Sequence, residues 1–534
     1  MRQNKISIII ILVVATIMIN SCSKKFTDDY KNLNSPSDVP PSLLLRSIEY
    51  DMWDAPFNQD ERNDQYTCSN YTYYDDNAYW DGTFHSQYAS LNYTDLWNVV
   101  SMESEAAKAA GGSTSTVYHA LGKFFRAYYF YEMTMKVGDL PMAEALQGTS
   151  NLSPKYDTQK DIFIQCFKWL DSANTEMAAL IASGIGEFSG DIYYIENPTN
   201  ALSPFDALTE WQKVVNTFRL RALIQLSQQS SDPDLNLSSQ FNTIISNPTQ
   251  YPIMTGMNDN LQFVYVNPYN VYPNSPNDFG NDALRYNMGA TYLNIVAGLN
   301  DLRAMITAEP ARGLGFADTS FSSFVGGPSG EALSTMAAGV QAGNISLINR
   351  HRYWETYTGE NTFIISYPEM CFNIAEAINR GLLSGSSEQW YINGIQASQS
   401  FYGIVDGPNT VIFQIPSGLL GQDETYTVHW TWANYYAQTS VKYAGDNATG
   451  LAQILTQKYL AFFRNSGLEA YYQWRRTGTP VFNAGPGTGN SGVIPIRWQY
   501  PLSESSTNTA NYNAAVQSQY GGNDNINQTM WLLK

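Results

Sequence analysis

The clearest hydrophobic pattern in the chain lies in residues 113–146. Apolar or aromatic residues recur there in alternating steps of four and three, the spacing of one face of an α-helix. They are Val117, Leu121, Phe124, Tyr128, Tyr131 and Met135. A second apolar stripe contains Tyr118, Phe125 and Tyr129. A helix that is apolar on two faces is buried between neighbours. Ser115 or Thr116 can cap its start, Gly138 suits its end and Pro141 prevents its continuation. The strongest pattern therefore predicts a scaffold helix.

Similar periodicity predicts further helices that join into antiparallel pairs. Residues 88–110 lead into the scaffold helix through two glycines. The other predicted pairs are 161–181 with 208–228, 366–383 with 390–401, and 451–464 with 468–475. Four such pairs resemble degenerate TPR units, although their period is irregular. Turn-rich segments 250–285 and 403–434 predict small β-hairpins, and residues after Val481 predict irregular structure. The expected fold is mostly α, with long irregular loops.

The first 22 residues have the composition of an export signal. Arg2 and Lys5 precede an apolar run over 8–19, which is too short to cross a bilayer. The run ends at Ser21 and Cys22, which resemble a lipobox; an ordinary secretory signal is the alternative. We therefore expect a signal peptide over 1–21, a lipid anchor at Cys22 with a polar tether over 22–41, and one ligand-binding domain over 42–534. No stretch of the chain has the eighteen or more apolar residues that a membrane-spanning helix needs.

Composition narrows the function classes. Only 15% of the 534 residues are charged and the formal net charge is −18, which argues against a nucleic-acid partner. A surface rich in uncharged polar residues is typical of an extracytoplasmic protein that binds an uncharged polar ligand. Cys68, Cys166 and Cys371 have no CxxC spacing, so they predict neither a disulfide framework nor a zinc site.

Two loops are dense in aromatic residues without helical or strand periodicity. They span 58–85 and 267–279. Exposed rings in such loops can act as stacking platforms for sugar rings or peptides. The alternative is that about half of the rings pack onto the helical core. The candidate ligand-binding residues are Tyr71, Tyr73, Tyr74, Trp80, Tyr269 and Tyr272.

Catalysis is not predicted. A glycoside hydrolase would need two carboxylates across a cleft, and the candidates are Asp75, Asp76, Asp81 and Glu132. With 48 acidic residues, such candidates carry little information. The four histidines show no metal-ligand spacing, and no nucleophile or phosphate-binding motif occurs. We therefore expect no catalytic residues, no cofactor and no metal. A secreted glycoside hydrolase and a structural or adhesion lipoprotein remain the alternatives.

Several blocks across the mature chain together resemble the SusD/RagB family of outer-membrane lipoproteins. In chain order they are Cys22, Gly138-Asp139-Leu140-Pro141 with Glu144-Ala145-Leu146, Leu299-Asn300-Asp301-Leu302-Arg303, Tyr367-Pro368-Glu369 with Ala375-Glu376-Ala377, Trp474-Arg475-Arg476-Thr477-Gly478-Thr479-Pro480, Pro495-Ile496-Arg497 with Tyr500-Pro501 and Glu504, and Gly521-Gly522-Asn523-Asp524 near Trp531.

The resemblance implies a SusD-like fold of four TPR-like helix pairs with a binding face built from loops. It implies a SusC-like TonB-dependent outer-membrane transporter as partner, on which the lipoprotein acts as a hinged lid at the cell surface. It also implies oligosaccharide ligands, or peptides in the RagB branch, and no catalysis. Within the motifs we expect Arg475, Arg476 and Arg497 to brace helix ends and carbonyl groups; ligand contact is the alternative.

Overall fold

The structure is a computed structural model that describes residues 38–80, 86–280, 282–416 and 418–534. The predicted signal peptide, the lipidation of Cys22 and nearly all of the tether fall outside the described residues, as does Asp81. In the described part of the chain, no helix is both long enough and apolar enough to span a bilayer.

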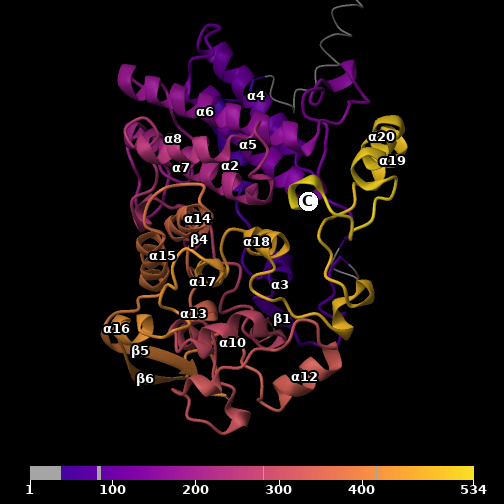
Figure 1. The fold of residues 1–534 in the computed structure, drawn as a ribbon. Helices are drawn as coiled ribbons and strands as arrows, with labels where there is room; N and C mark the ends of the chain where they lie inside the picture. Colours follow the sequence, from indigo (N-terminus) through magenta and orange to yellow (C-terminus); the bar gives the residue numbers. More distant parts are fainter. Residues whose placement is uncertain (1–37, 81–85, 281, 417) are drawn as a thin grey trace, which may run out of the picture.

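The left and centre of the upper half of the molecule in Figure 1 are built from amino-terminal helices. These are α2 (Pro41–Tyr50), α4 (Tyr93–Ala109), α5 (Val117–Val137), α6 (Gln159–Ser183), α7 (Pro204–Gln225) and α8 (Leu237–Ser246). The predicted scaffold helix is α5, which begins after Thr116 and ends at Gly138 with φ 90°. Both α4 and α6 pack against α5, and both of its stripes are buried. The prediction of a buried central helix is confirmed.

The second group of helices comes from the carboxy-terminal half of the sequence. It contains α14 (Tyr367–Asn379), α15 (Ser387–Phe401), α17 (Ala448–Ala461) and α18 (Glu469–Thr477). Together with α4–α5 and α6–α7 they form the predicted helix pairs, so the mostly helical fold is confirmed. Since α14 packs against α7 as well as α15 and α17, the two groups share one hydrophobic core.

Shorter helices surround this frame. They are α3 (Gln59–Asn63), α9 (Asp282–Arg285), α10 (Ala290–Gly298), α11 (Arg303–Thr307), α12 (Leu333–Gln341), α13 (Arg350–Trp354), α16 (Trp432–Tyr436), α19 (Leu502–Thr507) and α20 (Thr509–Tyr520). The prediction of irregular structure after Val481 was wrong for α19 and α20, which lie at one side of Figure 1. Their sequence is rich in Asn, Ser, Thr and Gln, and α20 buries only Ala515, Val516 and Tyr520, so the apolar period is weak.

The described strands form two-stranded antiparallel sheets. β1 (Thr67–Ser69) pairs with β3 (Tyr286–Met288), β2 (Leu261–Phe263) with β4 (Thr362–Ile365), and β5 (Gly407–Gln414) with β6 (Asp423–Trp430). The β5–β6 hairpin confirms the prediction for 403–434. The local hairpin predicted within 250–285 was wrong for β2, because its partner β4 lies about a hundred residues further on and local pattern carries no information about such pairing.

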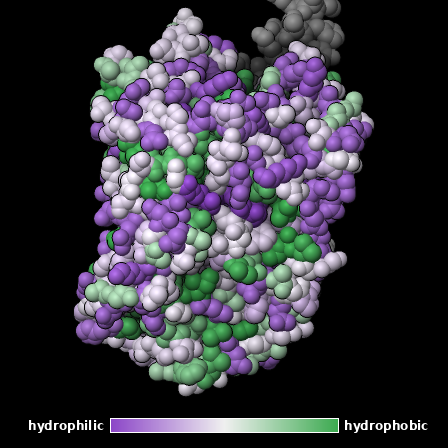
Figure 2. Space-filling view, in the orientation of Figure 1, coloured by the Kyte–Doolittle hydropathy of each residue, from purple (hydrophilic) through white to green (hydrophobic). Residues whose placement is uncertain are grey.

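Apolar side chains do not form one continuous area on the face shown in Figure 2. The hydrophobic surface there is divided into separate patches among polar residues. Such scattered apolar positions are ordinary on a folded surface. On this face, a ligand site is therefore better sought in particular loops than in a broad apolar area.

Candidate ligand-binding site

Three of the predicted tyrosines form one cluster at the surface, on the loop that follows β1. The Tyr71 ring lies edge-on to Tyr74, with centroids 5.1 Å apart, and 6.1 Å from Tyr73. Tyr73 is 84% exposed, Tyr71 is also exposed, and Tyr74 is half-buried. Exposed tyrosines held against one another present apolar ring faces and hydroxyl groups together. We call Tyr71, Tyr73 and Tyr74 the tyrosine platform.

The platform is held by Arg285 at the end of α9 and by Ser69 at the end of β1. The Arg285 guanidinium lies 4.3 Å from the Tyr71 ring centroid and donates a hydrogen bond to the Tyr74 hydroxyl at 3.3 Å. The side chain of Asn77 closes the base of the loop: its Oδ1 accepts from Ser69 N–H at 2.7 Å and its Nδ2 donates to the Ser69 carbonyl at 3.0 Å. These contacts fix the loop at both ends, so the rings are positioned before any ligand arrives.

Trp80 and Tyr272 point into the protein instead. Trp80 is 4% exposed, packs on Trp498 with centroids 3.7 Å apart and donates from Nε1 to the Arg497 carbonyl at 2.9 Å. Tyr272 is 1% exposed and accepts a hydrogen bond from Arg464 at 3.3 Å. Neither ring has a free face in this structure, so the prediction that these two rings stack on ligand is corrected: they support the loops from inside. Residue type and loop position did not tell inward rings from outward ones.

Tyr269 lies on a separate turn and is 92% exposed. Val266 and Asn270 close this turn through paired backbone hydrogen bonds of 2.7 and 2.8 Å. Within the described residues, no ring contact joins Tyr269 to the tyrosine platform. The two predicted loops therefore present exposed tyrosines at two places, and the ligand-binding role of all four stays a prediction.

The arginines in the sequence motifs hold the fold together. Arg475 donates to the carbonyl groups of Met135 at 2.6 Å and Ile496 at 3.1 Å. Arg476 forms two hydrogen bonds with Glu376, at 2.6 and 3.0 Å, and all four atoms are buried. Arg497 pairs with Asp524 at 2.7 Å. The expectation that these arginines brace helices and carbonyls is confirmed by these contacts.

The carboxylates considered for hydrolysis have other surroundings. Glu132 lies on α5 beside a small internal cavity that Asp54 and Arg221 also line. Burial and the nearby Glu469 carboxylate raise the pKa of Glu132 to about 8. Asp76 instead lies on the platform loop, where it accepts the Leu333 N–H at 2.6 Å. The two acids belong to different parts of the fold, the scaffold and a surface loop.

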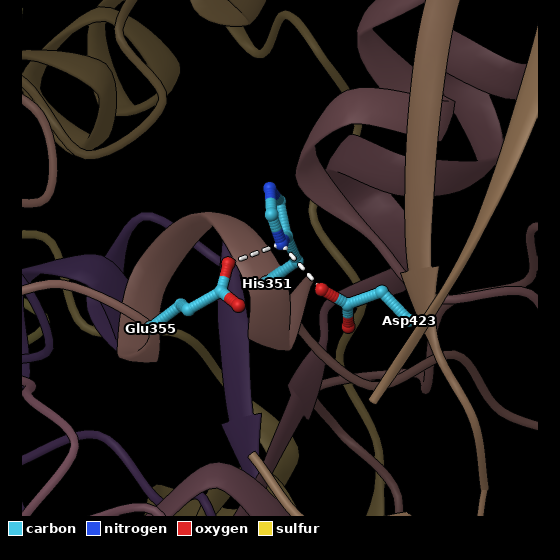
Figure 3. A group of neighbouring side chains, drawn as sticks. All are labelled: His351, Glu355 and Asp423. Carbon is cyan, nitrogen blue, oxygen red and sulfur yellow. Dashed lines mark hydrogen bonds and ion pairs between the residues drawn. The ribbon is translucent and has the colours of Figure 1, made fainter. Parts of the chain in front are cut away.

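A side-chain cluster beside a surface cavity was missed by the sequence analysis. The cavity has a volume of 570 Å³ and is lined by α13, the segment after it and β5. At its edge the carboxylates of Glu355 and Asp423 both face Nδ1 of His351 (Figure 3). The spacing of His351 and Glu355, four residues apart on one helical turn, was readable in the sequence. Asp423 comes from β6, and only the fold brings it there.

The sequence profile of a family described as starch-binding and associating with the outer membrane matches residues 33–501. The chain belongs to the SusD-like family. Among curated proteins, no significant relative was found. Among solved structures, two SusD homologues from Bacteroides fragilis are 26% and 29% identical to this SusD-like protein, with TM-scores of 0.77 and 0.72; each alignment covers 93% of this chain and 100% of the other.

A chitin-binding SusD homologue from Flavobacterium johnsoniae also shares the fold, at 19% identity and a TM-score of 0.62, with 93% of this chain and 96% of the other covered. The SusD-like assignment made from the motifs is confirmed, and so is the helical fold that it implied. Among the motif residues, Arg476, Arg497 and Glu376 are buried groups that brace the fold, so these positions report the fold and not the ligand.

Proposed function

We propose that this SusD-like protein captures an oligosaccharide at the cell surface and passes it to a TonB-dependent outer-membrane transporter of the SusC type. The tyrosine platform carries the proposal, because exposed, pre-positioned rings suit stacking against the C–H faces of sugar rings while their hydroxyl groups form hydrogen bonds. The family description, starch-binding and associating with the outer membrane, supports the same class of ligand.

Capture by such a platform has modest affinity. Each stacked ring contributes on the order of 1 kcal/mol, so the three rings together account for about 3 kcal/mol, or roughly a hundredfold in Kd. Modest affinity suits a protein that must release its cargo. Tyr269 offers a second contact for a longer chain, and Trp80 and Tyr272 act indirectly, by holding the two loops in place.

Delivery requires attachment and a partner. In the proposed arrangement, acyl chains on Cys22 hold the protein on the outer membrane, facing the cell exterior, and two or more chains suffice for stable attachment. The protein then closes as a lid on the transporter and moves the ligand toward its channel. Cys22→Ser should release the protein from the membrane fraction, and a tagged wild-type chain should co-purify with a TonB-dependent barrel.

The binding test uses the soluble chain that starts after Cys22, run on affinity gels containing starch or chitin fragments, with a peptide pool measured alongside. Tyr71, Tyr73 and Tyr74 are changed together to alanine. The matched control is Tyr50→Ala, an exposed tyrosine at the end of α2 in the other half of the molecule (Figure 1). We expect the triple variant to lose about a hundredfold in affinity for one polysaccharide and the control to bind normally.

Each other outcome has a definite meaning. Unchanged binding by the triple variant would refute the platform as the site. Binding of peptides alone would assign the protein to a RagB-like peptide function instead of glycan capture. Release of reducing sugar from the polysaccharide during incubation would support the alternative that the protein is a glycoside hydrolase.

A further inference from the structure

His351, Glu355 and Asp423 form a compact group of metal-ligating side chains. We propose that these three residues bind a divalent transition-metal cation, with Zn²⁺ as the best fit. One ligand atom from each residue lies within 4.8 Å of the other two, and all three side chains are half-buried. The cation would join α13 to the β5–β6 hairpin. No part of the proposed ligand capture uses this group.

The arrangement around the imidazole argues for a cation. Both carboxylates face the same ring nitrogen, Nδ1, and the Asp423 Oδ2 atom lies 2.8 Å from it. A neutral imidazole has one N–H and one acceptor nitrogen, so Nδ1 can satisfy at most one carboxylate with a well-aligned hydrogen bond. Even a protonated ring leaves one net negative charge on the group. A divalent cation at the meeting point would bond to all three atoms and remove the repulsion between the carboxylates.

The ligand set favours zinc over calcium or magnesium. Calcium and magnesium prefer oxygen ligands alone, whereas an imidazole nitrogen suits Zn²⁺, Cu²⁺ or Ni²⁺. In tetrahedral zinc sites, bonds of about 2.1 Å place the ligand atoms about 3.4 Å apart. The Nδ1–Oδ2 separation of 2.8 Å therefore has to widen by only about 0.6 Å. Three protein ligands leave one position for water.

Contacts that do not use the three ligand side chains already hold α13 against the β5–β6 hairpin. Asn349 caps α13 by accepting the Arg352 N–H at 2.8 Å, and its Nδ2 donates to the Ile412 carbonyl of β5 at 2.9 Å. Asp423 begins β6 and is paired in register with Gln414, whose N–H donates to Glu309 at 3.2 Å. Because helix and hairpin are attached to each other independently of the metal, binding costs little reordering, which favours affinity.

Figure 3 also shows which imidazole nitrogen of His351 would bind the cation. Nδ1 lies between the two carboxylates, while the other ring nitrogen points away from both. His351 and Glu355 line the 570 Å³ cavity, so the cation would sit at its rim. The expected consequence is a hairpin that is clamped to the cavity wall when metal is bound.

The test is calorimetric titration of the soluble, untagged chain after removal of metal with a chelator. Zn²⁺ should bind with a stoichiometry of one, and the melting temperature should rise when Zn²⁺ is added. His351→Ala and Asp423→Asn should each weaken Zn²⁺ binding by at least about tenfold. The matched control is His429→Ala, which removes an exposed histidine from the same strand, β6, and should leave binding unchanged.

Circular dichroism of each variant establishes that it is folded. Glu355→Gln removes the third ligand and should also weaken Zn²⁺ binding. Absence of stoichiometric Zn²⁺ binding to the wild-type chain would overturn the proposal. So would equal binding by His351→Ala, which would place any zinc elsewhere. Equal binding of Ca²⁺ and Zn²⁺ that is insensitive to His351→Ala would indicate only a carboxylate site and would equally refute the assignment.

Discussion

The buried carboxylate of Glu376 on α14 joins several helices through ion pairs. Replacing Glu376 by glutamine tests how much these ion pairs stabilise the fold. The Glu376 carboxylate binds Arg476 on α18 through two hydrogen bonds and Arg380 at 2.8 Å, and Lys458 on α17 lies 3.9 Å away. Although burial alone would raise the pKa of Glu376, the Arg476 guanidinium, Lys458 and Arg380 together lower it to about 2.

The contribution of the ionised Glu376 to the free energy of unfolding follows from that pKa. A fall from the usual 4.5 to about 2 corresponds to about 3 kcal/mol, at about 1.4 kcal/mol per unit. Because the folded-state pKa is depressed, this contribution is complete above pH 4.5 and is lost as the pH falls toward 2. Glu376→Gln also leaves the buried Arg476 and Lys458 without a counter-charge, which costs about 3–5 kcal/mol when a buried pair is broken. The loss at pH 7 is therefore about 3 kcal/mol or more.

The assay is urea denaturation of the soluble wild type and of Glu376→Gln at pH 7, 5, 4 and 3. The difference between the two proteins should shrink to less than half of its pH 7 value by about pH 3. The matched control is Glu196→Gln, since Glu196 forms an exposed ion pair with Arg46 and such pairs contribute about 0–1 kcal/mol. A Glu376→Gln protein as stable as the control, or a difference that does not change with pH, would refute the electrostatic reasoning.

Two further predictions separate scaffold from surface and test the second buried acid. Trp80→Ala should lower the free energy of unfolding by about 3–5 kcal/mol because it leaves a cavity beside Trp498. Tyr73→Ala should weaken glycan binding and leave the urea midpoint unchanged. The reverse pattern would refute the division between inward-facing and outward-facing rings. Glu132 has a folded-state pKa of about 8 against the usual 4.5, so its contribution is complete below pH 4.5 and is lost as the pH rises toward 8. The free energy of unfolding of Glu132→Gln, measured by urea denaturation, should therefore rise relative to that of the wild type between about pH 5 and about pH 8.5. A constant difference between the two proteins over this pH range would contradict the prediction.

Helices were predictable from the sequence where a long apolar stripe meets a clear end signal. α5 has both, with Thr116 and Gly138 at its ends, and α14 has Ser366, whose hydroxyl accepts the Glu369 N–H at 3.4 Å. Ser366 and Glu369 have the spacing of a capping box, but the Glu369 carboxylate binds Arg221 on α7 instead of the helix start. Local pattern identified the element, and tertiary packing decided what its side chains bind.

The features that sequence reasoning missed depend on contacts between distant segments. β2 pairs with β4, and Asp423 meets His351 only because the β5–β6 hairpin packs against α13. The direction of each ring in the aromatic loops is another such case: Trp80 finds its partner in Trp498, more than four hundred residues away. No periodicity in residues 58–85 encodes that partner.

The closed base of the tyrosine loop has a consequence for divergence within the family. Asn77 and Ser69 bond to each other across the base of the loop. Arg285 at the end of α9 holds Tyr71 and Tyr74, and Asp76 accepts the Leu333 N–H. The loop is therefore joined to the frame at its base and at these few side chains. Doubling the length of such a loop costs only about 0.6 kcal/mol in closure entropy. Insertions beside the exposed Tyr73 can therefore lengthen the loop while the helices stay unchanged. With ligand captured at the tyrosine platform as proposed, a change of length in this one segment would alter ligand preference without altering the fold.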